Sequence, residues 1–321
     1  MVSPHQESGL ESGRAVGRGG PGVRQSEPRI VVPLDGSEAA MAALPVARTL
    51  AEIGGATVHL LYVSERQLPL REVSGLLGLS PQQLDGVVLE EVIGEPGDRI
   101  LEFSCLPETT VVMTTHSAGP GAEHGLGPVT GQVLGSAGCP IVLVHPERGF
   151  GPWRLQRMLL PHDGSPVTAA GFRPAVRLAE KAEAAVFVLH VATLTGEPTP
   201  GSLPVPRYVD QPQHEWPEWT REFLERMDVF TEVSAGLPPR LLLSKGEPGE
   251  EILRFAAARS IDLIALSWHG TLEPRHAGTL KRVLDHAPCP IFFAKAPEEE
   301  PPARKSAGTI DLRESGPYLN S

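Results

Sequence analysis

Glycine and hydroxyl residues follow a short apolar stretch in the last quarter of the sequence. The apolar run of residues 263–266 ends at Ser267, and Gly270 and then Gly278 and Thr279 come next. A strand, a glycine-containing turn and a helix in this order direct backbone N–H groups at an anion, because the first turn of a helix leaves its amides without helical partners. Side chains that suit a polyphosphate lie in the same segment, at Arg275, His276, Lys281 and Arg282. The sequence therefore predicts an anion site, with a helix that begins near Gly278.

The elements that would position this segment occur twice in the chain. The strings RIVVPLDGS (29–37), IGEPGDRIL (93–101) and AGCPIVL (137–143) return as RMLLPHDGS (157–165), KGEPGEEIL (245–253) and APCPIFF (287–293). The second copy is lengthened by a proline-rich insertion around residues 193–217. Repeats of this size indicate two tandem copies of one domain. We expect tails without fixed structure at residues 1–28 and 297–321, domains at residues 29–146 and 157–296, and a linker at residues 147–156.

Apolar strands alternate with helix-like segments in each copy. In the first copy we expect strands at residues 29–34, 56–63, 86–93, 109–113 and 141–144. Helices should follow Ser37, span residues 94–105 and begin at Gly127, with at most one short helix in residues 64–85. Nearly all-apolar strands in this alternation predict an α/β fold with a parallel sheet covered by helices on both faces.

Composition excludes several classes of protein. The 321-residue chain carries a formal net charge of −11, which disfavours binding to nucleic acid or to anionic membranes. No apolar run reaches about 18 residues, so no membrane span is expected. The first residues lack the apolar core of a secretory signal. The three cysteines show no metal-type spacing, which favours reduced thiols in a cytoplasmic protein.

Each half resembles the universal stress protein domain, over roughly residues 29–145 and 157–295. The resemblance lies in PLDGSEAA and PHDGSPVT after the first strand, GEPG before the third helix, MTTHS and LSWHG after the fourth strand, and GCP and PCP before the fifth. It implies two tandem doubly wound domains, each a five-stranded parallel sheet of order 3-2-1-4-5. It also implies ATP, with Mg²⁺, at the carboxyl ends of the strands, where open α/β sheets place ligands.

Family members that bind ATP carry a phosphate loop of Gly, two residues, Gly, nine residues, then Gly with Ser or Thr. The first half places Thr114, Ser117, Gly127 and Pro128 on those four positions, so only Gly127 matches. Proline offers neither the hydroxyl nor the N–H of a serine or threonine. No lysine or arginine lies between Thr114 and Val144. We therefore expect the first half not to hold ATP.

The second half fits the loop better. Ser267 replaces the first glycine, Gly270 matches the second, and Gly278 and Thr279 can fill the final pair. Seven residues separate Gly270 from Gly278, where the family has nine. The tighter loop either still forms an anion-binding nest or closes over the phosphate position.

Other residues of the resemblance have two readings each. Asp163, with Asp35 in the first copy, takes the family position near adenine and ribose, or simply caps the following helix. Val191 and Val63 take the position whose backbone meets adenine, or are plain strand residues. The loop histidines His116 and His269 favour a structural role, because no paired carboxylate or nucleophile lies beside them. For Cys139 and Cys289, which precede prolines, packing is the better account. The insertion at residues 193–217 is a long connection or a partner surface.

Two functions of different class remain open at this stage. One is a stress-response regulatory protein that binds ATP or a related adenine nucleotide in its second half. The other is a universal stress scaffold that acts through protein contacts without a nucleotide. An enzyme is not expected, because the chain has no Walker loop, no SGGxDS loop and no acid–base pair at catalytic spacing. By the resemblance, the two copies should pair within the chain as a pseudo-dimer through their fifth strands, with further homodimerisation open.

Overall fold

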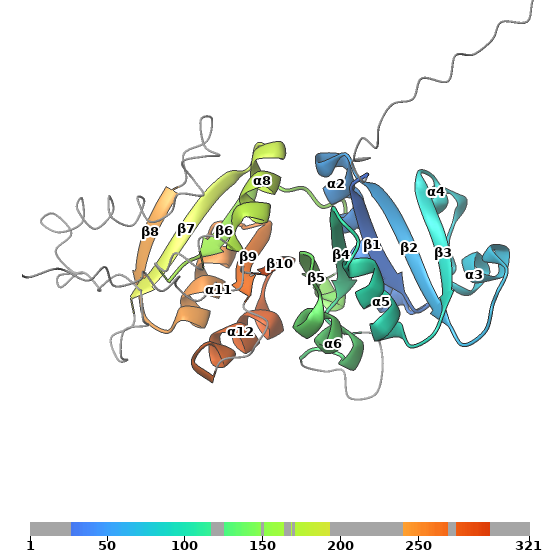
Figure 1. The fold of residues 1–321 in the computed structure, drawn as a ribbon. Helices are drawn as coiled ribbons and strands as arrows, with labels where there is room; N and C mark the ends of the chain where they lie inside the picture. The colour runs from blue at the N-terminus through green and yellow to red at the C-terminus, as the bar shows by residue number, and fades with distance from the viewer. Residues whose placement is uncertain are drawn as a thin grey trace, which may run out of the picture.

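The computed structural model describes residues 27–116, 125–148, 151–163, 168, 171–192, 240–268 and 274–295. The strands of the first half are β1 (Arg29–Leu34), β2 (Thr57–Ser64), β3 (Val87–Ile93), β4 (Thr109–Thr114) and β5 (Ile141–Val144). Those of the second half are β6 (Arg157–Pro161), β7 (Ala185–Ala192), β8 (Arg240–Lys245), β9 (Leu263–Trp268) and β10 (Ile291–Lys295). Together they form one sheet in the order β3-β2-β1-β4-β5-β10-β9-β6-β7-β8 (Figure 1).

The strand order is the same in both halves and follows the expected 3-2-1-4-5 arrangement. Within each half all paired strands are parallel, as the apolar strand sequences predicted. The halves meet in the middle through an antiparallel pair, in which Phe292 of β10 lies opposite Val142 of β5. The expected pairing of the copies through their fifth strands is therefore present in the sheet.

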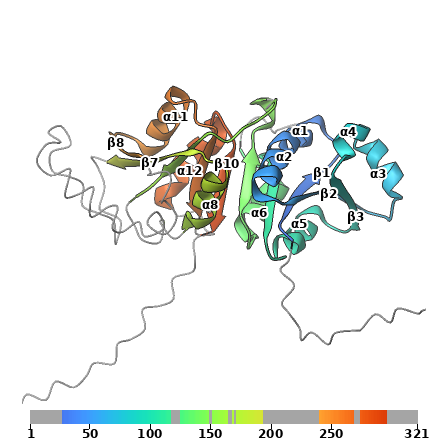
Figure 2. The same cartoon turned by 90° about the horizontal axis from the view of Figure 1, so that it is seen from above.

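Helices cover both faces of the sheet. The first half has α1 (Glu38–Met41), α2 (Ala43–Gly54), α3 (Leu70–Leu76), α4 (Pro81–Leu84), α5 (Pro96–Ser104) and α6 (Pro128–Ser136), followed by the short 3₁₀ helix η1 (Pro146–Arg148). The second half has α8 (Arg173–Lys181), α11 (Pro248–Ala258) and α12 (Pro274–His286). One apolar core lies between the sheet and α2 with α8, and the other between the sheet and α5, α6, α11 and α12 (Figures 1 and 2).

Residues 64–85 differ from the expectation of at most one short helix. They contain both α3 and α4. The second of these begins in a capping box, in which the Ser80 hydroxyl accepts the Gln83 N–H and the Gln83 side chain accepts the Ser80 N–H. Pro81 then occupies the first helical position, where its missing N–H costs nothing. These local signals were present in the sequence, but the short length of the segment hid them.

The segment between the halves is packed rather than loose. Trp153 is only 8% exposed, and its indole N–H donates to the Asp262 carbonyl at 3.1 Å. The Asp262 carboxylate in turn accepts the backbone N–H groups of Gln156 and Arg157. The Thr49 hydroxyl of α2 donates to the Trp153 carbonyl at 2.9 Å. Trp153 therefore fastens the end of the first half to the start of the second.

None of the helices in the described ranges is long and apolar enough to cross a membrane. The predicted tails, apart from residues 27–28, and the insertion at residues 193–217 lie outside those ranges.

Candidate functional site

The strands of the first half run in the opposite direction to those of the second half, because β5 and β10 pair antiparallel. The carboxyl ends of the two sets of strands therefore point in opposite directions. Each half therefore has its own carboxyl edge. In the second half, Asp163, Val191 and Ser267 come to one edge, at the ends of β6, β7 and β9. Because β6 lies between β9 and β7, the strand order reverses there, and open α/β sheets bind ligands at such a switch point.

Ser267 has an unused hydroxyl at this edge. The residue is half-buried in β9, opposite Ala294 of β10. Its Oγ is inaccessible to solvent and has no hydrogen-bond partner among the described residues. A buried hydroxyl without a partner costs about 1–3 kcal/mol, which a ligand that supplies a partner would recover.

Val191 and Val63 lie in the strand ladders. Val191 pairs with Ser244 of β8, and Val63 pairs with Val92 of β3. Both valine side chains pack against the core that the sheet shares with α5, α6, α11 and α12. Their side chains are explained by strand packing, and any ligand contact would come from backbone atoms.

Asp163 and Asp35 have different surroundings. Asp35 is exposed, and its Oδ1 accepts the backbone N–H of Ser37 at 2.9 Å and the Ser37 hydroxyl at 2.6 Å. Ser37 then caps α1 by accepting the N–H of Ala40 at 3.1 Å. The intervening Gly36 has a φ of +86°, a region that favours glycine. In the first half, the turn-capping reading of this aspartate therefore accounts for its contacts.

In the second half, Asp163 lies beside a buried histidine. The Asp163 Oδ1 is 3.8 Å from the Nδ1 of His162, which is 4% exposed. A second buried histidine, His190 of β7, has its Nδ1 2.9 Å from the His162 carbonyl oxygen. Burial lowers the pKa of His162 to about 4, although the nearby Asp163 carboxylate opposes the shift. Burial also lowers the pKa of His190, so both rings are neutral at pH 7.

The sequence prediction missed His162 and His190. The signal was visible, since the first copy reads PLDGS and the second PHDGS. A leucine of the first strand is thus replaced by a histidine next to the candidate aspartate.

A backbone hydrogen bond joins the two described ends of the loop in the first half. The Gly127 N–H donates to the Thr115 carbonyl at 2.8 Å, so this amide cannot meet a phosphate. A Cβ on Gly127 would lie 3.4 Å from the Cα of His116, which shows how closely the two segments pack. Thr130 of α6 adds a hydrogen bond from its hydroxyl to the Thr114 carbonyl at 3.0 Å. Ser117 lies outside the described residues.

His116 is a packed residue. It is 7% exposed, and its Nδ1 lies 3.0 Å from the Thr115 hydroxyl. Its ring meets the ring of His145 edge to face at 5.5 Å. Burial, followed by the Arg148 charge, lowers the pKa of His145. These contacts support the structural role expected for His116, whereas His269 lies outside the described residues.

The loop helix of the second half begins earlier than expected. It starts at Pro274, four residues before Gly278, because proline suits the first position of a helix. Gly278 and Thr279 therefore lie in the second turn, where a backbone N–H pairs within the helix. Because Pro274 has no N–H, the helical residues whose amides lack helical acceptors are 275 and 276. Gly278 is exposed with open space beside it, and Gly270 lies outside the described residues.

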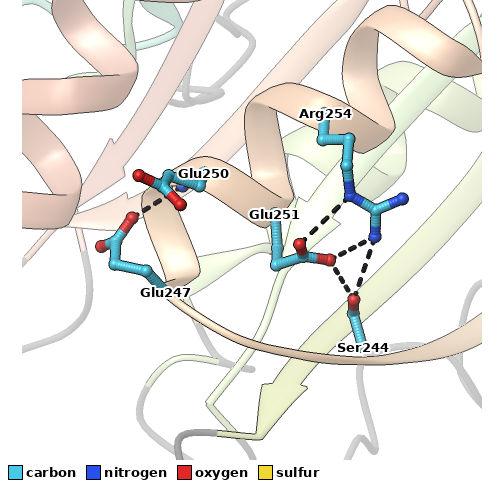
Figure 3. Close-up of polar contacts among 5 residues, drawn as sticks. All are labelled: Ser244, Glu247, Glu250, Glu251 and Arg254. Carbon is cyan, nitrogen blue, oxygen red and sulfur yellow. Dashed lines mark hydrogen bonds and ion pairs between the residues drawn. The ribbon is translucent and has the colours of Figure 1, made fainter.

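The charge of Arg282 is already paired with carboxylates of the protein. Its guanidinium pairs with Glu250 and lies 3.6 Å from Glu247, both at the start of α11. The same end of α11 holds a second group, in which Glu251 accepts from Arg254 and from the Ser244 hydroxyl (Figure 3). Hydrogen bonding from Arg254 lowers the pKa of Glu251. Of these residues, which join β8, α11 and α12, only Arg282 was singled out from the sequence.

Cys139 and Cys289 pack in the interior, as expected. Both are buried, and burial raises the pKa of each thiol to about 12. All three cysteines, with the exposed Cys105, are free. Among the described residues, no group of three histidine, cysteine or acidic side chains could hold a metal ion.

Comparison with known proteins finds relatives of part of the chain. Residues 154–295 match the model of the Universal stress protein family. Universal stress protein MJ0531 of Methanocaldococcus jannaschii is 27% identical over 151 residues, which are 45% of this chain and 85% of the relative. Universal stress protein YxiE of Bacillus subtilis is 28% identical over 148 residues, which are 43% of this chain and 98% of the relative.

Two solved structures share the fold. A universal stress protein from Archaeoglobus fulgidus has a TM-score of 0.58 at 17% identity, covering 83% of this chain and 98% of that one. A functionally unknown protein from Pseudomonas aeruginosa has a TM-score of 0.57 at 16% identity, covering 85% and 94%. Identities this low speak for the fold alone. Together, the family match, the relatives and the α/β fold support a universal stress protein whose Usp domain spans residues 154–295.

Proposed function

We propose that the chain is a tandem universal stress protein whose second half binds ATP or a related adenine nucleotide, and whose first half has lost that ability. The observation that carries the proposal is the pair Asp163 and Ser267, which flank the switch point of the second half. A carboxylate there can accept hydrogen bonds from ribose hydroxyls, and the Ser267 hydroxyl lacks a partner among the described residues.

The backbone supplies the second element of the proposed site. The start of α12 leaves the amides of residues 275 and 276 without helical acceptors, and a helix N-terminus attracts negative charge. In this proposal the phosphates meet those amides rather than the N–H of Gly278.

The first half supports the same proposal by contrast. Its equivalent edge uses the Gly127 amide for a hydrogen bond to Thr115 and the Asp35 carboxylate for the Ser37 turn. Pro128 removes a further donor. A ligand at this edge would have to replace contacts that the protein already makes.

No catalytic reaction is part of the proposal. Without a cluster of protein ligands in the described ranges, Mg²⁺ would arrive on the phosphates of the nucleotide. The role we assign is regulatory: occupancy of the second half alters a surface that a partner reads. A cytoplasmic location remains a prediction.

Matched substitutions in the two halves test the proposal. Asp163→Asn and Asp35→Asn change the same carboxylate in each copy, and Ser267→Val and Thr114→Val change the same strand position. Calorimetry with ATP and Mg²⁺ should give binding by the unmodified protein. The second-half changes should each weaken it about tenfold or more, since a hydrogen bond to a charged group contributes about 1.5–3 kcal/mol. The first-half changes should leave it within about twofold.

Absence of binding by the unmodified protein at millimolar ATP would overturn the proposal and favour the scaffold without a nucleotide. The scaffold has an observation on its side, because Arg282 is already engaged with Glu247 and Glu250. Mass spectrometry of the purified protein separates the two, since a stoichiometric adenine nucleotide excludes the scaffold.

A further inference from the structure

Two buried histidines and the half-buried Ser267 stand level with one another at the carboxyl edge of the second half. His162 continues β6, and its N–H donates to the Leu189 carbonyl of β7 at 2.9 Å, which sets it beside His190. On the other side, the pairing of Met158 with Leu263, continued along both strands, sets Ser267 of β9 level with His162. We call His190, His162 and Ser267 the polar row.

The polar row lies on the face of the sheet that α8 covers. Side chains alternate along a strand, and Met158, Leu160 and Val188 on the same two strands belong to the core beneath α2 and α8. His162 and His190 therefore point toward that core. The ring of Phe172 lies 5.7 Å from the ring of His162 and closes it from above.

The first half has no such row. At the matching positions, residues 62 and 34 are Tyr62 and Leu34, which belong to or pack against the same apolar core. Thr114 takes the place of Ser267. The second copy thus has two histidines where the first has Tyr62 and Leu34. Burying two polar imidazole rings costs free energy that apolar side chains would not cost.

His190 holds the end of β6 through one hydrogen bond. The acceptor is the His162 carbonyl, so the Nδ1 of His190 must carry the proton. The neighbouring residue is Asp163, whose carboxylate lies 3.8 Å from the other imidazole. The position of Asp163 thus depends on both rings.

We propose that His162 and His190 are positioning residues that hold the end of β6, and with it Asp163, only while both rings are neutral, so that ligand binding at this edge is linked to a proton. This inference rests on the proposed function. A proton on either ring would place a charge in the core beneath α8, opening the end of β6.

The charges that act on the rings include the Asp163 carboxylate, which raises the pKa of both, and the His190 ring, which lowers the pKa of His162. The backbone hydrogen bond to His162 raises the pKa of His190. From α8 the ring of Phe172 faces His162, whereas the charged residues of that helix are exposed, namely Arg173, Arg177, Glu180 and Lys181. One carboxylate at 3.8 Å does not offset the loss of water around two imidazoles, which is why burial dominates and lowers the pKa of both.

The sign of the linkage follows. Free histidine takes up a proton near pH 6.5, whereas the folded rings resist it. Between pH 7 and pH 5 the opened form gains protons that the closed form does not, so acidification favours opening. Nucleotide affinity should therefore fall about tenfold over this range.

The test compares ATP binding at pH 7 and pH 5 in the full chain. A double variant, His162→Leu with His190→Asn, cannot titrate and should lose most of the fall. The single variant His190→Asn keeps a donor for the His162 carbonyl but removes one of the two titrating rings, so it should lose part of the fall. His59→Gln, on β2 of the first half, is the matched control and should keep the full fall. The affinities of the variants and of the unmodified protein are compared at the same pH, so the effect of protonating the nucleotide cancels. An equal fall in all variants would overturn the inference.

A measurement without ligand separates this inference from the proposed function. Amide-exchange protection in residues 159–162 and 187–190, corrected for the intrinsic effect of pH, should drop at pH 5 in the unmodified protein. The drop should be smaller in His190→Asn, which keeps one titrating ring, and protection should persist in the double variant if that folds. If no variant binds ATP at pH 7, the proposed function fails, yet this drop still supports the histidine linkage. Equal protection at both pH values in the unmodified protein would overturn it.

Discussion

The two halves share one strand order, but their carboxyl edges differ in how many of their polar groups are already hydrogen-bonded within the protein. In the first half, backbone and side chains satisfy one another: Gly127 bonds Thr115, and Asp35 bonds Ser37. In the second half, Ser267 has a buried hydroxyl without a partner among the described residues, next to neutral buried histidines. Donors that already form hydrogen bonds within the protein are not available to a ligand.

The largest expected difference between the halves is a loss of stability in the second half as the pH falls. The folded pKa of His162, about 4, lies below the ordinary 6.5, so its contribution to stability is complete above pH 6.5 and declines as the pH falls toward 4. From pH 7 to pH 4.5 this costs roughly 3 kcal/mol of unfolding free energy. Urea unfolding of the unmodified protein and of His162→Leu measures it. Between pH 7 and pH 4.5, the unfolding free energy of His162→Leu should fall by about that much less than that of the unmodified protein. An equal fall in both proteins would show that His162 is not the source.

Hydrogen-bond deletions should separate the edges next. Thr130→Val leaves the buried Thr114 carbonyl without its donor and should lower the unfolding free energy by about 1–2 kcal/mol. Ser267→Ala removes a hydroxyl that has no partner within the described ranges, so the loss should stay below about 0.5 kcal/mol. Chemical denaturation at pH 7 gives both values. A Ser267→Ala cost as large as that of Thr130→Val would mean that the hydroxyl is already satisfied.

The smallest difference should come from the helix pairs beneath the sheet. Arg282 forms ion pairs with Glu247 and Glu250, whereas the uncharged side chain of the corresponding Gln132 donates a hydrogen bond to the Asp98 carboxylate at 2.8 Å. Arg282→Gln should cost only about 0.2–1 kcal/mol, because the guanidinium is 41% exposed and water screens it. The loss should shrink in 1 M salt. A cost that does not respond to salt would point to packing instead.

The apolar sequences predicted the strands, because buried parallel strands are apolar throughout, and the resemblance predicted their order and the pairing of the two copies. These predictions failed where a short local signal decided the structure. The capping box at Ser80 added a helix, and Pro274 began α12 before Gly278. Such boundaries depend on one or two residues, which a search for apolar periodicity passes over.

The candidate site was predicted only in part, for a different reason. The resemblance pointed to Asp163, Val191 and Ser267, and the fold brings these three to one edge. It could not point to His162 or His190, because their role depends on the register of β6 against β7 and on burial beneath α8. Contacts of that kind arise between elements, and no single stretch of sequence contains them.

The number of nucleotides bound per chain tests the contrast between the halves most directly. Titration of the full chain with ATP and Mg²⁺ at pH 7 should give one site, which Asp163→Asn weakens and Asp35→Asn leaves unchanged. Two equivalent sites, or a single site that follows Asp35 instead, would contradict the account.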